Sequence, residues 1–205
     1  MHQRTIVIDF ETTGLSARGG DRAIEVGAVA LVNGKVADRF QSLLNPGFRV
    51  SAFIENYTGI SNAMLADAPG SRQVMPRLRD FIGDAVLVAH NASFDQGFLQ
   101  AEYQRLGLRD SHPFICSMRV ARRLYPDAPN HRLGTLVEYA RVPVCGQFHR
   151  ALADAEMTAR LWLAMLAQLA DRYRIDPASP ALLRKLQAVK ISRADAYLRD
   201  VAAQY

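Results

Sequence analysis

The stretch IVIDFETTGL, residues 6–15, places the strongest constraint on the fold. Residues 6–8 and Phe10 form an apolar run that is typical of a β-strand buried on both faces. Asp9 and Glu11 stand at the end of this strand, and because side chains alternate along a strand, both carboxylates point to the same side. Two unit charges about 4 Å apart repel by about 4 kcal/mol at an effective dielectric of 20. The strand therefore needs something that offsets this repulsion.

The rest of the chain predicts an α/β fold. Strands are expected at 22–32 and 35–45, joined as a hairpin by Asn33-Gly34, because both residues accept positive φ. Residues 46–70 are expected to be irregular. Further strands at 85–89 and 113–117 alternate with helical patterns within 71–83, 90–107, 118–125, 132–141 and 151–173. This order predicts a three-layer α/β sandwich with a mostly parallel sheet.

The C-terminal segment is expected to be a helical extension. Residues 174–180 interrupt the pattern, and Ser179 followed by Pro180 predicts a new helix start. The amphipathic segment after it is expected to pack on the domain, with contact to a partner as the alternative. We therefore expect a main domain over 1–173 and an extension over 174–205.

Composition excludes several classes of protein. The 205 residues, 49% hydrophobic and 22% charged, suffice for one domain with a sizeable core. No run is long enough to span a membrane, and no signal-peptide pattern is present. Two cysteines without a CxxC motif predict a reduced, cytoplasmic protein without a structural zinc site. The net charge of +5 is compatible with an anionic partner such as nucleic acid, but compositional bias explains it equally well.

Two more acids are expected near Asp9 and Glu11. Asp95 opens a helix directly after the strand 85–89, and Asp154 heads the apolar stripe of the helix 151–173. An acid near a helix start is most often a cap or a dipole partner, and that alternative stays open for each of the two alone. Four acids at one sheet edge, however, can be held together by hard divalent cations. The strand end is thus predicted to be half of a metal site.

His149 precedes Asp154 by five positions, which would place the two about 140° apart on a helix. If both serve one site, His149 lies in the loop before the helix or at its very start, and Pro143 and Gly146 favour a loop there. A histidine in that place can act as a general base, although a surface histidine is the commoner case.

Three motifs together resemble those of the DEDDh 3′–5′ exonucleases, a family that includes the proofreading epsilon subunit of bacterial DNA polymerase III. They are DFETTGL (9–15), HNASFD (90–95) and HRALAD (149–154), and the resemblance covers about residues 4 to 170. It implies a ribonuclease-H-like fold with a five-stranded mixed sheet whose second strand is antiparallel. Cys116-Ser117 departs from the Asp-Thr that many relatives carry, so local packing there is expected to differ.

The resemblance also implies roles for the site residues. Asp9 would bridge two Mg²⁺ or Mn²⁺ ions, Glu11 and Asp154 would complete the tighter site, and Asp95 would act on the second ion through water. His149 would take a proton from the attacking water. Substrate contacts are implied for Thr12, Thr13, Gly14, Leu15, Thr58, Ile60 and Phe94, of which Phe94 is equally well explained as core.

The implied substrate is the 3′ end of single-stranded DNA, with RNA as the alternative because the motifs do not separate the two. A catalytically silent nucleic-acid-binding or polymerase-associated module is a second alternative, although none of the five catalytic residue types is missing. A dinucleotide-binding module is disfavoured because no G-x-G-x-x-G follows the first strand. A DNA polymerase is a candidate partner, but the chain has no long flexible tether, which favours a free-standing or loosely associated nuclease.

Overall fold

The computed structural model describes residues 4–109, 111–143 and 150–204 and has a five-stranded mixed sheet at its centre. The sheet order is β3-β2-β1-β4-β5. β2 is antiparallel to β1 and β3, whereas β1, β4 and β5 run parallel to one another. The antiparallel second strand predicted from the sequence is thereby confirmed. The strands are β1 (Arg4–Thr12), β2 (Ala23–Val32), β3 (Lys35–Leu43), β4 (Val86–Ala89) and β5 (Phe114–Cys116).

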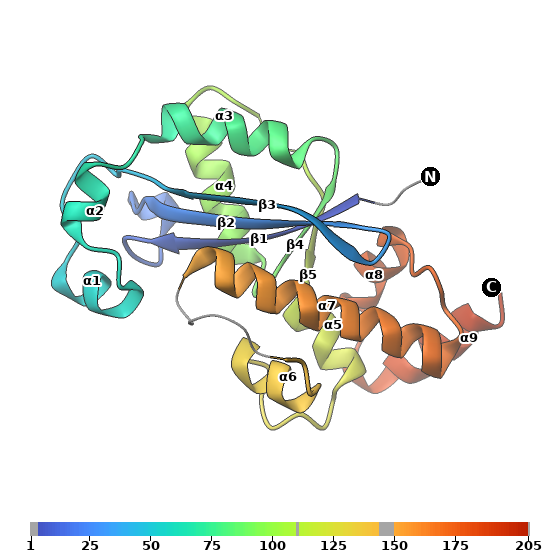
Figure 1. Cartoon of the computed structure of the whole chain (residues 1–205). Helices are drawn as coiled ribbons and strands as arrows, with labels where there is room; N and C mark the ends of the chain where they lie inside the picture. Colours follow the sequence, from blue (N-terminus) through green and yellow to red (C-terminus); the bar gives the residue numbers. More distant parts are fainter. Residues whose placement is uncertain (1–3, 110, 144–149, 205) are drawn as a thin grey trace.

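Helices cover both faces of the sheet and give three layers (Figure 1). Helices α3 (Ser71–Ile82) and α4 (Ser93–Arg105) lie on one face. The long helix α7 (Ala151–Tyr173) lies on the other, together with α5 (Ser117–Leu124) and α6 (Leu133–Tyr139). This arrangement confirms the predicted α/β sandwich. The helices are needed on each side because the sheet is buried on both faces.

The hairpin between β2 and β3 forms at Asn33-Gly34, as the sequence predicts. Asn33 has a φ of 52° and Gly34 a φ of 72°. Two consecutive residues with positive φ give the turn whose twist matches that of the flanking strands.

The prediction that residues 46–70 are irregular is wrong in two places. Helices α1 (Ala52–Thr58) and α2 (Asn62–Ala66) form there. Each begins at a serine whose hydroxyl accepts a bond from a backbone N–H, Ile54 N to Ser51 Oγ at 3.4 Å and Met64 N to Ser61 Oγ at 3.1 Å. Helices this short depend on caps and tertiary contacts, which hydrophobic periodicity does not reveal.

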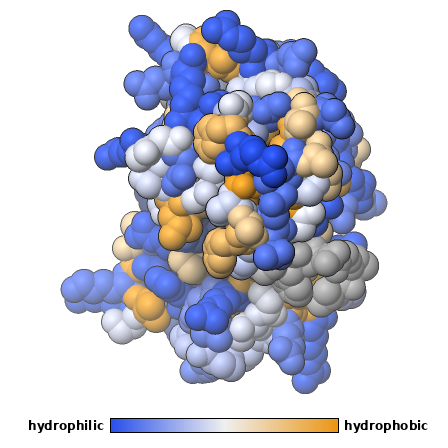
Figure 2. Space-filling view, turned by 90° about the vertical axis from the view of Figure 1, so that its left-hand side faces the viewer, coloured by the Kyte–Doolittle hydropathy of each residue, from blue (hydrophilic) through white to orange (hydrophobic). Residues whose placement is uncertain are grey.

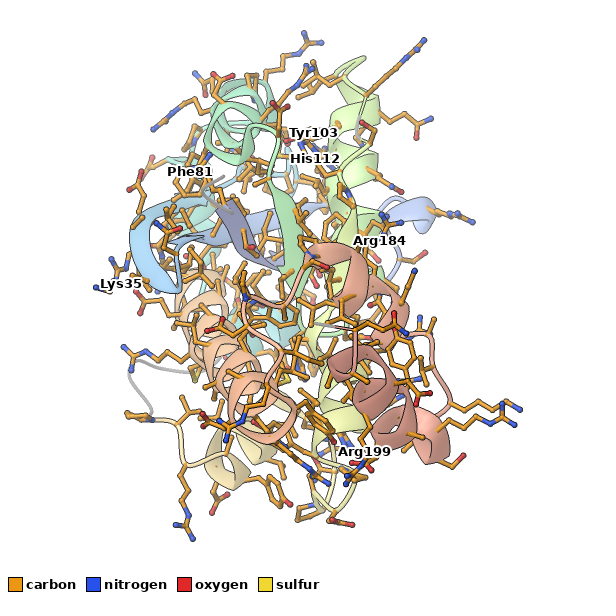
Figure 3. The ribbon with its side chains drawn as sticks, turned by 90° about the vertical axis from the view of Figure 1, so that its right-hand side faces the viewer. Lys35, Phe81, Tyr103, His112, Arg184 and Arg199 are labelled. Carbon is orange, nitrogen blue, oxygen red and sulfur yellow. The ribbon has the colours of Figure 1, made fainter. Side chains whose placement is uncertain are left out.

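The C-terminal segment packs on the rest of the molecule. Ser179 caps α8 (Pro180–Leu186), and α9 (Ala194–Ala202) follows. Leu183 and Leu198 lie in the same buried cluster as Trp162 of α7. Figure 3 shows both helices beside α7, with Arg184 on α8 and Arg199 on α9. Short 3-10 helices occupy Ala17–Gly19 and Ile191–Arg193.

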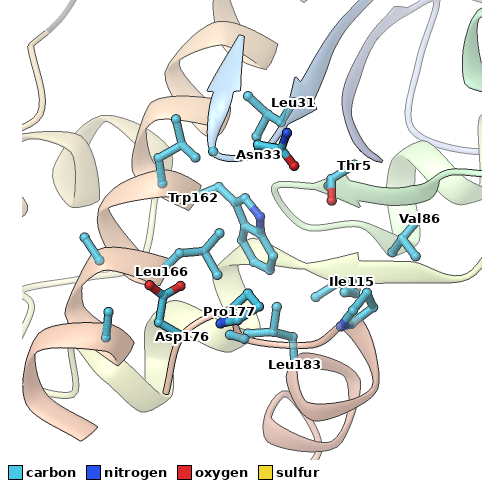
Figure 4. Close-up of a pocket in the computed structure, with 16 residues that line it drawn as sticks. Thr5, Leu31, Asn33, Val86, Ile115, Trp162, Leu166, Asp176, Pro177 and Leu183 are labelled. Carbon is cyan, nitrogen blue, oxygen red and sulfur yellow. The ribbon is translucent and has the colours of Figure 1, made fainter. Parts of the chain in front are cut away.

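A cavity of about 540 Å³ lies between α7, the segment before α8 and the start of β1. Figure 4 shows Trp162, Pro177 and Leu183 at its wall, with Thr5 on the opposite side. Among the described residues, no helix combines the length and apolar character needed to cross a bilayer.

Candidate active site

Strand β1 directs its acids toward α7. Ile8 and Phe10 belong to the buried cluster under α3 and α4, whereas Val7 belongs to the cluster under α7. Because side chains alternate along a strand, Asp9 and Glu11 follow Val7 to the α7 side. The side-by-side arrangement expected from the sequence is therefore present at the carboxyl end of β1.

Helix α7 brings the third acid to this place. Asp154 lies in its first turn, and one carboxylate oxygen from each of Asp9, Glu11 and Asp154 lies within 4.8 Å of the other two. Carboxylate oxygens are the ligands that hard divalent cations prefer. The three residues, which are distant in sequence, can thus hold one metal ion together.

The start of α7 is fixed by a buried carboxylate that was not among the predicted site residues. Glu25 of β2 is fully buried and accepts hydrogen bonds from Arg150 Nη2 at 2.8 Å, from Arg150 Nε at 3.1 Å and from the backbone N–H of Ala151 at 3.0 Å. The amide of Gln41 donates a further bond at 2.9 Å. A charged residue inside the apolar run AIEVGAVALV was the available signal, because buried acids are rare unless paired.

Gly27 lets α7 approach the sheet closely. A Cβ at this position would stand 2.2 Å from the backbone nitrogen of Leu152. Gly27 also pairs directly with Asp9 across the β1–β2 ladder. A glycine within a strand pattern indicates such a close backbone approach, so the signal for this contact was present in the sequence.

Asp95 reaches the site from the opposite layer. It lies in the first turn of α4, is 2% exposed, and accepts a hydrogen bond from the backbone N–H of Phe10 at 3.1 Å. Asp95 is outside the group of three acids that share one potential metal position. Its negative charge nevertheless contributes to the raised pKa of Asp9, so the four acids form one electrostatic unit.

The pKa values of these acids are raised by burial and by mutual repulsion. Burial, with Asp154 and Glu25, raises the pKa of Glu11 to about 8, although Arg150 acts in the opposite direction. Burial is also the main cause that raises the pKa of Asp95 to about 8. For Asp9, burial and the neighbouring acids raise the pKa well above its ordinary value. The raised pKa values show that the ionised state of this cluster is unfavourable without a counterion. Bound divalent cations would stabilise the ionised carboxylates through their positive charge.

His149 lies outside the described residues. The first described residue after it is Arg150, the N-cap of α7.

The segment after β1 is held in place by hydrogen bonds. Thr13 Oγ1 donates to Asp21 Oδ1 at 3.1 Å, and the backbone N–H of Ser16 donates to Asp21 Oδ2 at 2.9 Å. Gly14 lies against this same carboxylate, because a Cβ there would stand 2.5 Å from it. The loop that carries Thr12, Thr13 and Gly14 is therefore preorganised.

A cavity of about 550 Å³ opens beside Glu11. Most of the predicted substrate-contact residues line it, and α1 closes one side. Phe94 contributes both to the cavity and to the core, because its ring packs on Phe98 with 4.9 Å between ring centroids. The predicted residues in the lining are Thr12, Thr13, Gly14, Leu15, Thr58 and Phe94, and the lining residues without a prediction include Ser51, Phe53, Ile54 and Tyr57.

Ile60 is not part of this lining. Its side chain is fully buried in a small cluster with Ile24, Val50, Ile54 and Leu65. A role for Ile60 in substrate binding stays a prediction.

The Cys116-Ser117 position has its own local packing. Ser117 is fully buried, donates to the carbonyl of Ala89 at 3.2 Å and bonds His90 Nδ1 at 2.9 Å. Burial lowers the pKa of His90 to about 4.

Comparison with known proteins places the chain among exonucleases. The RNase_T family model, described as an exonuclease, matches residues 6–162. The DNA polymerase III PolC-type of Bacillus subtilis is 44% identical over 169 residues, and that of Caldanaerobacter subterraneus subsp. tengcongensis is 40% identical over 166. These alignments cover 82% and 81% of this chain but 12% of each relative. The chain thus spans a small part of the relatives it matches.

Solved structures show the same fold. Exonuclease X in complex with 5′ overhanging duplex DNA superposes with a TM-score of 0.69 at 26% identity, over 89% of this chain and 99% of that one. The nuclease domain of 3′hExo, a DEDDh family member bound to rAMP, gives a TM-score of 0.70 at 22% identity, over 81% and 92% of the two chains. At that identity the likeness is one of fold.

Proposed function

This chain belongs to the RNase_T exonuclease family, and from that premise we propose that it is a metal-dependent 3′–5′ exonuclease. It would hydrolyse phosphodiester bonds from the 3′ end of single-stranded DNA and release 5′-mononucleotides. The observation that carries the proposal is the convergence of Asp9, Glu11 and Asp154, with one oxygen of each within 4.8 Å of the others.

Two Mg²⁺ or Mn²⁺ ions would bind at the acidic cluster. Asp9, Glu11 and Asp154 would hold the tighter one, and Asp95 would act on the second through water. Bound cations supply Lewis-acid activation of water and stabilise the departing 3′-oxygen. His149 would accept the proton of the attacking water as general base.

The cavity beside Glu11 would receive the terminal nucleotide. The backbone of Thr12, Thr13 and Gly14, with Glu11, would hold the 3′-hydroxyl, while Leu15 and Phe94 would lie against the terminal bases. Thr58 and Ile60 belong to the same proposed contact surface. Apolar and aromatic groups suit this task because stacking on bases tolerates any sequence.

The test uses DNA labelled at its 5′ end. A single-stranded oligonucleotide incubated with Mg²⁺ should shorten one nucleotide at a time, and EDTA should stop the reaction. Asp154→Asn, with an unchanged circular dichroism spectrum, should be inactive. Early products that come from cleavage at internal positions would contradict the proposal, and so would full cleavage by Asp154→Asn. Much faster degradation of a matched RNA oligonucleotide would favour the RNA alternative.

The setting of the reaction is a further part of the proposal. Similarity to PolC-type polymerases supports DNA as substrate and a role in proofreading or repair, by a free-standing or loosely polymerase-associated nuclease. Cys116 is a free, buried cysteine, which supports a cytoplasmic setting. Co-purification of a DNA polymerase from cell extract tests the association. Residues 1–173 would form the catalytic unit, with 174–205 as a packed support.

A further inference from the structure

Helix α1 presents two aromatic rings to solvent. Phe53 is 71% exposed and Tyr57 is 51% exposed, although both belong to a helix that buries Ile54 and Thr58 on its neighbouring face. The rings lie one helical turn apart and stack, with centroids 5.9 Å apart and planes inclined by 11°. Burial of either ring in the core therefore does not explain this pair.

The pair stands on a rigid support. Thr58 Oγ1 donates to the carbonyl of Ile54 at 2.8 Å and accepts from the N–H of Ile60 at 3.1 Å, which closes the end of α1. The amide side chain of Asn62 bonds both the N–H and the carbonyl of Val50, at 2.8 and 3.0 Å, just before α1 begins. Aromatic rings on a helix anchored at both ends form a preorganised surface.

Both rings line the cavity that also contains Glu11. Figure 2, which looks onto the end where α1 and α2 lie, shows apolar side chains in the middle of this face. Leu15, which is 87% exposed, lines the same cavity. Apolar surface is thus continuous with the proposed catalytic site.

We propose that Phe53 and Tyr57 form a stacking platform for a nucleobase of the 3′-terminal dinucleotide. The inference rests on the proposed function and adds a binding surface on α1 to it. An open pair of parallel rings offers a flat face, which is the shape that a nucleobase needs and that a single-strand-binding protein uses without reading sequence. Continuity of the rings with Glu11 in one cavity favours a nucleic acid over a protein partner on this surface.

The test removes the more exposed of the two rings. Phe53→Ala should leave the fold intact because this side chain is 71% exposed. It should raise the KM for single-stranded oligothymidylate roughly five- to tenfold, with little change in kcat, and weaken binding of a fluorescein-labelled oligothymidylate in EDTA by a similar factor, as expected for one lost stacking contact. Phe48→Ala, which removes a ring 52% exposed and outside the cavity lining, should change neither quantity.

Abasic substrates locate the base. An oligonucleotide that lacks one of its two 3′-terminal bases should bind the wild-type protein more weakly, and at that position Phe53→Ala should cause no further loss. Losses that add fully at both positions, or unchanged binding by Phe53→Ala, would overturn the platform and leave the surface to a protein partner. A wild-type protein that binds the oligonucleotide through Phe53 but does not cleave it would refute the proposed function alone.

Discussion

Gly27 of β2 and Leu152 of α7 lie in direct backbone contact, since a Cβ on Gly27 would stand 2.2 Å from the nitrogen of Leu152. This contact places the first turn of α7, with Asp154, against the strand that pairs with Asp9. The metal-binding arrangement of the acids therefore depends on a residue without a side chain.

Gly27→Ala is expected to push α7 away from the sheet. The clash is with backbone, which cannot rotate aside, so we expect a loss of about 1–3 kcal/mol in the free energy of unfolding. Because a displacement of about 1 Å can cost a hundredfold in rate, cleavage should fall by at least tenfold. Gly97→Ala in α4 is the matched control, since a Cβ there meets nothing within 4 Å. Equal effects of the two substitutions would contradict the role of the contact.

Asp9→Asn should separate activity from stability. Removing a residue that hydrogen-bonds a metal ligand typically lowers metal affinity or activity by about 10- to 100-fold. Removing a direct ligand should therefore reduce cleavage by more than about 100-fold. The metal-free variant should unfold at a higher temperature than wild type at pH 8, because burial and the neighbouring acids oppose ionisation of the Asp9 carboxyl group in the folded state and asparagine does not ionise. Asp80→Asn, at an exposed position of α3, should leave both quantities unchanged. A lower melting temperature for Asp9→Asn would argue against repulsion in the cluster.

The stability of the metal-free protein should fall as the pH rises. Glu11 and Asp95 have pKa values of about 8 in the folded state, above their ordinary values of 4.5 and 3.8. The folded state therefore holds protons that the unfolded state has released, and stability is lost as the pH rises from about 4 through 8, by an amount on the order of a few kcal/mol.

Saturating Mg²⁺ should raise the melting temperature more at pH 8 than at pH 5, because the ion binds the ionised carboxylates of the folded state. Urea unfolding between pH 5 and 9, with EDTA and with Mg²⁺, measures both effects. Glu11→Gln should flatten the pH dependence in EDTA. Glu102, whose pKa is lowered mainly by Arg22 and Ser71 against the effect of burial, acts with the opposite sign but only near and below pH 4.5. A metal-free protein that gains stability from pH 5 to pH 8 would contradict the electrostatic account.

Glu25→Ala should destabilise the protein by about 1–3 kcal/mol, because it leaves the buried Ala151 N–H without its acceptor and Arg150 without its carboxylate partner. Cleavage should fall as well, since Glu25 fixes the start of the helix that carries Asp154. Glu156→Ala on the same helix removes a pair with Arg39, which is 51% exposed, and should cost about 1 kcal/mol or less. Denaturant unfolding of the two variants gives the comparison, and similar losses would show that Glu25 is not an anchor.

Leu183→Ala tests the packing of the C-terminal segment. This leucine is 2% exposed in the cluster under α7, so the cavity left behind should cost about 2–5 kcal/mol. Cleavage per folded molecule should be retained at 25 °C, because α8 contributes nothing to the lining of the cavity beside Glu11. Ile191→Ala, at a site 49% exposed, should change stability by about 0.5 kcal/mol or less. A selective loss of activity in Leu183→Ala would instead couple the extension to catalysis.

The features that depend on a few neighbouring residues could be predicted from the sequence alone. The alternation along residues 6–11 predicts that Asp9 and Glu11 lie on one side of a strand. Asn33-Gly34 predicts the hairpin, and the apolar spacing in 151–173 predicts the long helix. Each of these follows from side-chain direction or backbone freedom over a few neighbouring residues.

The tertiary structure decided which distant residues meet. Ala151 N–H and Glu25 bond across 126 positions, Gly27 admits the backbone of α7, and the aromatic rings of α1 line the cavity beside Glu11. No period within one segment encodes such contacts, because they depend on how separate layers pack. The short helix α1 was not predicted for the same reason. Its stability comes from its caps and from the buried cluster in which Ile54 packs.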